Sequence, residues 1–238
     1  IDTQSENWDE YLNTDDRITT EKTDNVMISF FDEEGDPRPE AFFMWASDVT
    51  KIQFEKNYDE TIEFVSDPSD AIDNDLKAVD MSEAKDKSVM AYTTTNNGEK
   101  ILHIAAKDGV VMANKNSMAV FAMLTQAKTI EFNKCYNTVN AENMALMFGN
   151  DIDDGNGISS WEKIDVTSFN TSNVTNMNGM FAFCDDVVSL DLSTFDTSKV
   201  TDMSNMFTTC FSLETIKFSE KFITSNVTSM SRMFAECY

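Results

Sequence analysis

Alternating apolar and polar positions predict β-strands in the first half of the chain. The run 49–54 alternates in this way, and we expect it to form a half-buried strand. Two further alternating runs flank Asn96, Asn97 and Gly98, residues that tolerate the positive φ of a tight turn. We therefore predict a β-hairpin over 88–106, within an N-terminal region that is rich in strands.

From about residue 127 onward, the apolar pattern repeats along the chain. Met-Phe pairs mark the copies and follow one another at spacings of 33, 26 and 27 residues; the pairs begin at Met147, Met180, Met206 and Met233. Self-similarity near 26 residues is typical of proteins whose repeats stack side by side. It therefore outweighs local propensity in predicting the fold.

Each repeat combines a pattern of helical spacing with an alternating one. In "TSNVTNMNGMFAFC" (171–184) apolar residues fall at i, i+3, i+6, i+7 and i+10, which is one face of a short helix that Thr171 or Ser172 can cap. Short strands are expected between the helices, at 128–132, 162–166, 188–192 and 214–218. Because side chains alternate across a strand, one row must point outward. That row is Glu131, Asp165, Asp191 and Lys217.

These patterns predict an α/β solenoid preceded by a β-rich region. One repeat cannot bury its own apolar face, whereas stacked repeats form a parallel sheet with helices on the other side. We expect an acidic N-terminal region over 1–115, with a cap that includes the 88–106 hairpin, and the repeats over 116–238. Since no polar cap follows the last repeat, we expect the array to continue beyond Tyr238. Cysteines at one position of successive repeats are predicted to stay separate, buried thiols; they are Cys184, Cys210 and Cys237.

The repeat resembles the leucine-rich repeats of BspA-like bacterial surface proteins. The likeness rests on units such as "SLDLSTFDTSKVTDMSNMFTTC" (189–210); it is close across 160–238 and looser across 116–148. It implies a right-handed leucine-rich-repeat-type solenoid, with one short parallel strand and one short helix in each repeat. The resemblance also implies a secreted or surface-displayed bacterial protein that takes part in adhesion. It carries no shared catalytic residues.

Charge and composition exclude several classes of partner. The net charge is −24, so nucleic-acid backbones and anionic membrane surfaces would be repelled. No apolar run reaches the roughly 18 residues of a membrane span. His103 is the only histidine, and we expect a half-buried residue in the middle of its strand. Without a second histidine, we predict neither a histidine-pair metal site nor a histidine-based triad.

The acidic stretch "DIDDGNGISSWE" (151–162) interrupts the repeats and partly matches an EF-hand calcium loop. The expected carboxylate ligands are Asp151, Asp153, Asp154 and Glu162. However, Gly155 stands where a ligand is needed, and Asn156 stands where the loop requires glycine. Calcium binding and a glycine-rich surface loop both stay open as interpretations, and no other cofactor is predicted.

Three classes of function fit these observations. The first is a non-catalytic binding protein that presents the row Glu131, Asp165, Asp191 and Lys217 to a protein or glycan on a host or neighbouring cell. Simple solvation of an exposed sheet face is the other interpretation of this row. The second class is a structural spacer that displays another domain. The third is a glycan-acting enzyme, but nothing predicts the pocket that would separate the pKa values of paired carboxylates. We therefore predict a binding protein, not an enzyme, either monomeric or stacked end to end as a dimer through its open apolar end.

Overall fold

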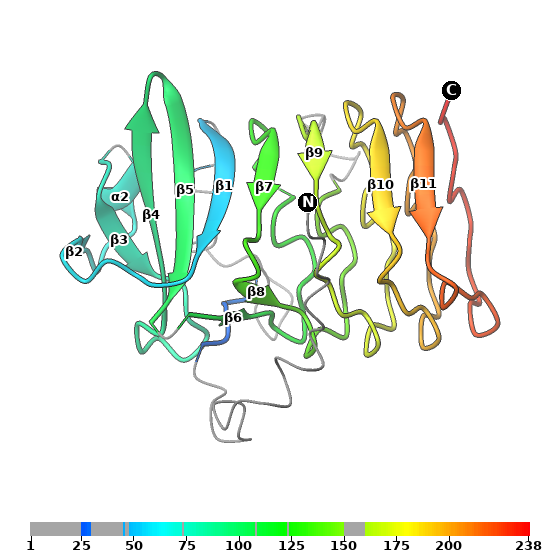
Figure 1. The fold of residues 1–238 in the computed structure, drawn as a ribbon, viewed down its shortest axis with the longest axis horizontal. Helices are drawn as coiled ribbons and strands as arrows, with labels where there is room; N and C mark the ends of the chain where they lie inside the picture. Colours follow the sequence, from blue (N-terminus) through cyan, green and yellow to red (C-terminus); the bar gives the residue numbers. More distant parts are fainter. Residues whose placement is uncertain are drawn as a thin grey trace, which may run out of the picture.

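The computed structural model describes residues 25–29, 45, 48–72, 74–107, 109–122, 124–149 and 160–238. A mixed seven-stranded sheet dominates the described fold, in the order β2–β3–β4–β5–β1–β7–β9 (Figure 1). Its strands are β1 (Val49–Glu55), β2 (Glu63–Phe64), β3 (Lys77–Asp80), β4 (Val89–Asn96), β5 (Glu99–Ala106), β7 (Thr129–Glu131) and β9 (Lys163–Ile164). Two small parallel sheets accompany it, β10 (Ser189–Leu192) with β11 (Thr215–Phe218), and β6 (Val111–Met112) with β8 (Tyr136–Asn137).

The strand predicted at 49–54 and the hairpin predicted at 88–106 are confirmed. β1 covers the expected run, and β4 pairs with β5 as an antiparallel hairpin. At its turn, Asn97 and Gly98 have φ values of 50° and 83°, as a two-residue hairpin loop requires.

The N-terminal strands and the repeats share one sheet. β1 lies between β5 and β7 and runs parallel to both. β1, the first of these strands along the chain, therefore lies between the β4–β5 hairpin and β7, the strand of the first repeat (Figure 1). Since the sheet crosses the proposed boundary between 115 and 116, the division into two domains stays a prediction.

Each repeat contributes a short strand where alternation predicted one. Ile130, Ile164 and Leu190 are buried beneath these strands. The positions between the inward residues point away from the core, as expected from the period of two. Within the described residues, no helix has both the length and the apolarity needed to cross a membrane.

The predicted α/β leucine-rich-repeat-type solenoid is wrong. Among the described residues the α-helical structure is α2 (Ser69–Ile72), which is four residues long and lies outside the repeats. The segment 171–184, expected to be a helix, forms successive turns instead. The described fold is β-rich and is built on the mixed sheet, so the leucine-rich-repeat assignment does not hold.

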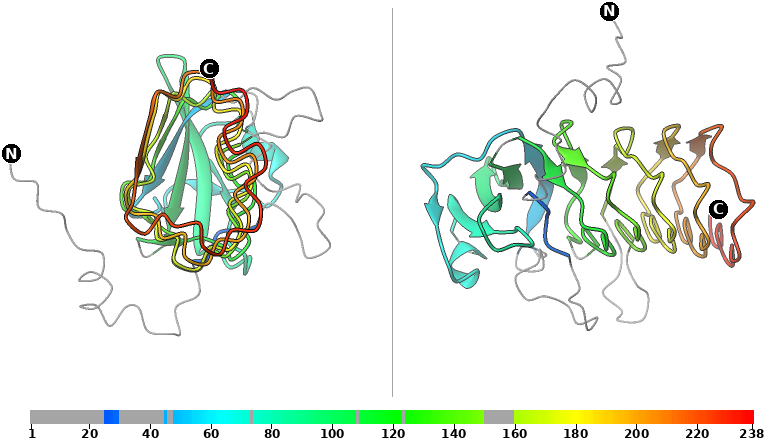
Figure 2. Two further views of the ribbon diagram at one scale, coloured as in Figure 1. Left: turned by 90° about the vertical axis from the view of Figure 1, so that its right-hand side faces the viewer. Right: turned by 90° about the horizontal axis from the view of Figure 1, so that it is seen from below.

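Turn segments lie side by side opposite the strands, and we call them the turn wall (Figure 2). Parallel bridges join the residues that lead into neighbouring segments. In the described residues the turn wall comprises 117–122, 144–149, 177–184, 203–210 and 230–237.

The backbone conformation explains why turns replace helices. Gly179 and Phe183, four residues apart, have φ values of 59° and 62°, whereas an α-helix needs every residue in the right-handed region. Ala182 donates its N–H to the Gly179 carbonyl, three residues back, at 2.9 Å. The N–H of Gly179 donates to Ser204 of the next repeat at 2.8 Å. Along the segment, some backbone N–H groups thus donate to a carbonyl within the same short turn, and others donate to a carbonyl of the neighbouring repeat.

The apolar face predicted for the repeat is buried even though it is not helical. Its phenylalanine rings stack in a column with centroid separations between 5.1 and 5.8 Å. The rings belong to Phe121, Phe148, Phe181, Phe207 and Phe234. The cysteines are free, as predicted; Cys184 and Cys210 are buried, whereas Cys237 is half-buried in the last repeat. One core cluster runs from Met27 to Met233.

Candidate functional site

An open hollow of about 1610 Å³ lies beside and beyond the carboxyl ends of β7, β9, β10 and β11. Four successive repeats line it, each with the residues that follow its strand. Phe132 and Phe169 lie buried beneath the lining. Hydroxyl, amide and charged groups make up most of the rest, among them Ser168, Thr194, Ser219 and Lys221. The hollow therefore runs across repeats and is lined mainly by residues that carry polar groups.

Short aspartate turns form where two of the strands end, β9 and β10. Asp165 Oδ1 accepts hydrogen bonds from the Thr167 N–H at 3.1 Å and from its hydroxyl at 2.7 Å. Asp191 Oδ1 likewise accepts from the Ser193 N–H at 2.9 Å. Aspartate favours this turn because its side chain can bond the backbone two residues on. Hydrogen bonds from Ser193 and Lys217 hold the pKa of Asp191 below its usual value.

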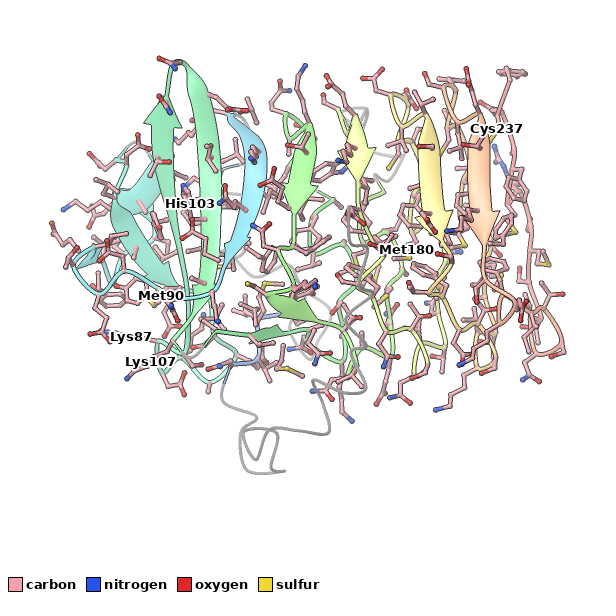
Figure 3. All side chains as sticks on the ribbon, in the orientation of Figure 1. Lys87, Met90, His103, Lys107, Met180 and Cys237 are labelled. Atoms are coloured by element: carbon pink, nitrogen blue, oxygen red, sulfur yellow. The ribbon has the colours of Figure 1, made fainter. Side chains whose placement is uncertain are left out.

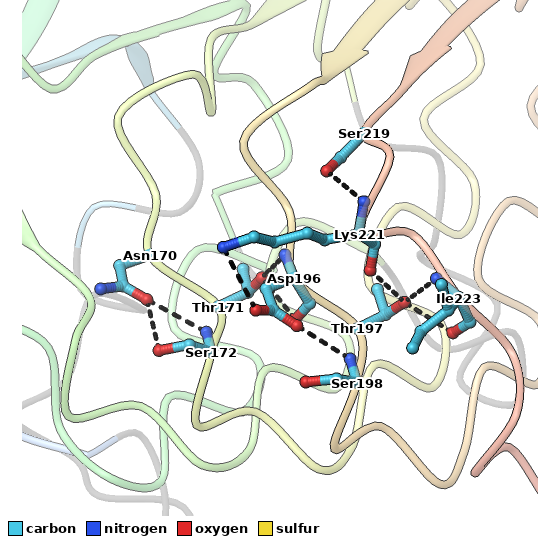
Figure 4. Close-up of polar contacts among 9 residues, drawn as sticks. All are labelled: Asn170, Thr171, Ser172, Asp196, Thr197, Ser198, Ser219, Lys221 and Ile223. Atoms are coloured by element: carbon cyan, nitrogen blue, oxygen red, sulfur yellow. Dashed lines mark hydrogen bonds and ion pairs between the residues drawn. The ribbon is translucent and has the colours of Figure 1, made fainter.

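Buried threonines tie the repeats together behind this lining (Figure 4). Thr171 Oγ1 donates to the Asp196 carbonyl at 3.0 Å and accepts from the Asp196 N–H at 2.8 Å. Thr197 makes the same pair of bonds to Ile223, both at 2.7 Å. The prediction that Thr171 caps a helix is wrong, since its hydroxyl bonds the next repeat. Each threonine fixes the spacing of two neighbouring repeats, and thus the shape of the hollow.

The structure divides the row predicted to bind a partner. Glu131 and Asp165 line the hollow, whereas Asp191 and Lys217 do not. Glu131 pairs with Lys51 of β1 at 2.8 Å, and Asp191 pairs with Lys217 at 2.9 Å. Much of the charge on the row is therefore neutralised within the protein.

The four residues proposed for calcium cannot be placed together. Asp151, Asp153 and Asp154 lie outside the described residues. Glu162 is described, and its carboxylate pairs with Lys128 at 2.6 Å. In the described part of the chain, no group of three or more His, Cys, Asp or Glu side chains could hold a metal ion.

The sequence did not predict the polar cluster that surrounds His103, a residue of β5 that Figure 3 labels. His103 Nδ1 lies 2.7 Å from Glu55 Oε1, and its Nε2 lies 2.8 Å from the Thr94 hydroxyl. Tyr92 stacks on the imidazole ring and donates its hydroxyl to Glu55 Oε2 at 3.0 Å. The bond to His103 lowers the pKa of Glu55 despite partial burial. A hydroxyl–imidazole–carboxylate chain needs only one histidine. The lack of a second histidine was therefore a wrong reason to exclude a histidine-based triad.

The hairpin register could have revealed part of this cluster. It sets Tyr92 directly opposite His103. Glu55 comes from β1, and no signal in the sequence showed that β1 pairs with β5. None of the four residues lines the hollow, so the cluster and the hollow are separate features of the sheet.

Comparison with curated proteins gives no match, and comparison with solved structures gives none either. A family model described as "Mycoplasma protein of unknown function, DUF285" matches residues 116–238, which is more than half of the 238-residue chain. That description does not mention BspA-like proteins, so the sequence resemblance to that family stays a prediction, although the leucine-rich-repeat fold that it implied is wrong. The match begins at residue 116, where we placed the start of the repeats. Because the family model covers more than half of the chain, the chain belongs to the DUF285 family.

Proposed function

We propose that the protein is a non-catalytic binding protein, secreted or displayed on a cell surface, whose hollow holds an extended protein or glycan. The hollow is the observation that carries this proposal. It is open, it crosses four repeats, and most of its lining can form hydrogen bonds. Such a surface suits a long partner better than a small substrate, because each repeat offers contacts to the next stretch of the same chain.

The charges around the hollow favour a polar partner of low net charge. Its acidic residues are Glu131, Asp165, Asp196 and Glu220, and its basic residues are Lys134, Lys163 and Lys221. Asp196 and Lys221 also approach each other, with a closest distance of 3.8 Å. Since neither sign dominates, hydrogen bonds are expected to give more of the specificity than long-range attraction.

A binding screen against glycans and extracellular matrix proteins tests the proposal. Thr194→Arg introduces a long side chain at an exposed position of the lining, and Thr95→Arg makes the same change at the exposed end of β4. Titration calorimetry should show that Thr194→Arg weakens a partner found in the screen at least tenfold, while Thr95→Arg leaves it unchanged. If both variants bound the partner equally well, or if the screen found no partner, the hollow would not be the binding site. Either result would favour the interpretation of the protein as a structural spacer.

A further inference from the structure

Many lysines of the described chain are held in ion pairs, but three at one end of the sheet are not. On the strands, Lys51 pairs with Glu131 and Lys100 pairs with Asp48, both at 2.8 Å. Within the described part of the chain, three exposed lysines have no ion-pair partner although the protein carries a net charge of −24, and we call them the lysine edge. They are Lys56, Lys87 and Lys107.

The lysine edge lies where three adjoining strands reach the same end of the sheet. Lys56 follows β1, Lys107 follows β5, and Lys87 comes shortly before β4. Because β5 pairs parallel with β1 and antiparallel with β4, these three positions are neighbours. The Lys107 N–H donates to the Ser88 carbonyl at 3.0 Å. In Figure 3, Lys87 and Lys107 are labelled next to each other at this end of the sheet.

Described carboxylates that adjoin these lysines along the chain are engaged by other groups. Glu55, next to Lys56, bonds His103 at 2.7 Å. Asp86, next to Lys87, accepts the Ser88 N–H at 3.0 Å. The lysine edge is therefore a place where positive charge is available to a partner.

The hollow continues to the lysine edge along the same end of the sheet. β7 runs parallel to β1, and residues that follow β7 line the hollow (Figure 1). One of them, Asn133, donates its side-chain amide to the Phe54 carbonyl at 2.9 Å, two residues before Lys56. None of the three lysines lines the hollow itself. A long partner that leaves the hollow past β7 would reach Lys56 first and Lys107 next.

The lining of the hollow favours a glycan over a protein as this partner. Protein interfaces gain most of their affinity from tyrosine, tryptophan and arginine anchors. Among its described residues the lining has none of these, and its two phenylalanines, Phe132 and Phe169, are only 4% and 2% exposed. It offers hydroxyl and amide groups instead, as at Ser168 and Asn170, and these can bond the hydroxyl groups of sugars.

We propose, building on the function proposed above, that the partner is a neutral glycan that ends in an acidic sugar. Its neutral sugars lie in the hollow, where charges of both signs balance, and its terminal carboxylate contacts the lysine edge. A lysine ammonium is a compact charge on a flexible stem, so Lys56 and Lys107 can both turn toward one carboxylate. Salt screens charges beyond about 8 Å, which limits the repulsion from the distant acidic residues.

Titration calorimetry of the full chain with three lactosamine hexasaccharides tests this proposal. The first is uncapped, the second ends in N-acetylneuraminic acid, and the third ends in glucuronic acid. At physiological ionic strength, at least one capped glycan should bind about tenfold more tightly than the uncapped one, and added salt should remove the difference. Comparison of the two caps identifies the acidic sugar that fits.

A pair of double variants locates the contact. Lys56→Gln with Lys107→Gln should abolish the preference for the capped glycan and leave binding of the uncapped glycan unchanged. Lys128→Gln with Lys199→Gln makes the same change in net charge at two exposed positions outside the lysine edge, and should keep the preference.

The outcomes separate this proposal from the function on which it rests. Equal binding of capped and uncapped glycans, or a preference that survives in the lysine-edge variant, would overturn the acidic-sugar contact. The hollow would still be supported if Thr194→Arg weakened the uncapped glycan. Binding of none of the three glycans would also overturn this proposal, and a matrix protein that Thr194→Arg displaces would then support the hollow alone.

Discussion

At the scale of single residues, Thr171 is expected to contribute stability through both functions of its hydroxyl. Thr171→Val keeps the shape but leaves the Asp196 N–H and carbonyl without their partner in a buried place. Each unsatisfied buried group costs about 1–3 kcal/mol, so we expect a loss of at least that size in the free energy of unfolding. Urea denaturation followed by circular dichroism measures it.

Thr171→Ser is the matched control for this change, because serine keeps the hydroxyl and removes the methyl group. It should lose clearly less stability than Thr171→Val. Equal losses in the two variants would mean that packing of the methyl group, not the pair of hydrogen bonds, makes the threonine important.

Asp185 is predicted to make stability depend on pH. Burial, and then the charge of Asp186, raise the pKa of Asp185 to about 6, whereas an unfolded aspartate titrates near about 3.9. Asp185 therefore binds a proton more readily in the folded protein than in the unfolded chain, and the bound proton stabilises the folded state. This contribution to the free energy of unfolding is lost as the pH rises through about 6. Asp185→Asn should raise the free energy of unfolding at pH 8 by about 1 kcal/mol, after allowance for solvent screening. Below about pH 4 the gain should disappear.

Urea denaturation of the wild-type protein and of Asp185→Asn at pH 4, 6 and 8 tests the direction of this pH dependence. Glu214→Gln removes one negative charge from an exposed position in the next repeat, and so controls for the high net charge of the chain. A gain for Asp185→Asn that is the same at all three pH values would contradict the raised pKa.

At the scale of elements, alternation predicted strands well because it follows directly from side-chain direction. The spacing i, i+3, i+7 was ambiguous, because a chain of short turns can bury the same positions as a helix. Within 171–184 the signal against a helix was the abundance of Asn, Thr and Ser around Gly179, all weaker helix formers than alanine. Burial was therefore predictable from the sequence, and the backbone conformation was not.

Contacts between repeats were beyond local sequence reasoning. A Cβ atom at Gly149 would lie 2.1 Å from the Gly179 carbonyl oxygen, so the two segments approach as closely as glycine permits. The threonine bonds behind the hollow are equally non-local. For the candidate site, sequence alone predicted that Glu131 and Asp165 face outward, but not that they border a hollow or that Glu131 pairs with Lys51.

At the scale of the whole molecule, the N-terminal region and the repeats are joined by aromatic packing as well as by the sheet. Phe54 of β1 is fully buried. Its ring centroid lies 6.1, 5.2 and 4.8 Å from those of Phe121, Phe132 and Tyr136. The joint between β1 and the first repeat is thus part of one core, and the two regions should unfold together.

Phe54→Ala tests this cooperativity. Removing a buried phenylalanine costs about 3–5 kcal/mol, and if the core is shared the loss must reach the repeats. Native-state hydrogen exchange should therefore become faster at the Phe148 and Phe181 amides as well as at the amides of β1. Phe64→Ala, in the small cluster on the other face of the sheet, should affect the amides of β2 and β3 more than those of the repeats. If Phe54→Ala left exchange in the repeats unchanged, residues 116–238 would be a domain that is stable without the N-terminal strands.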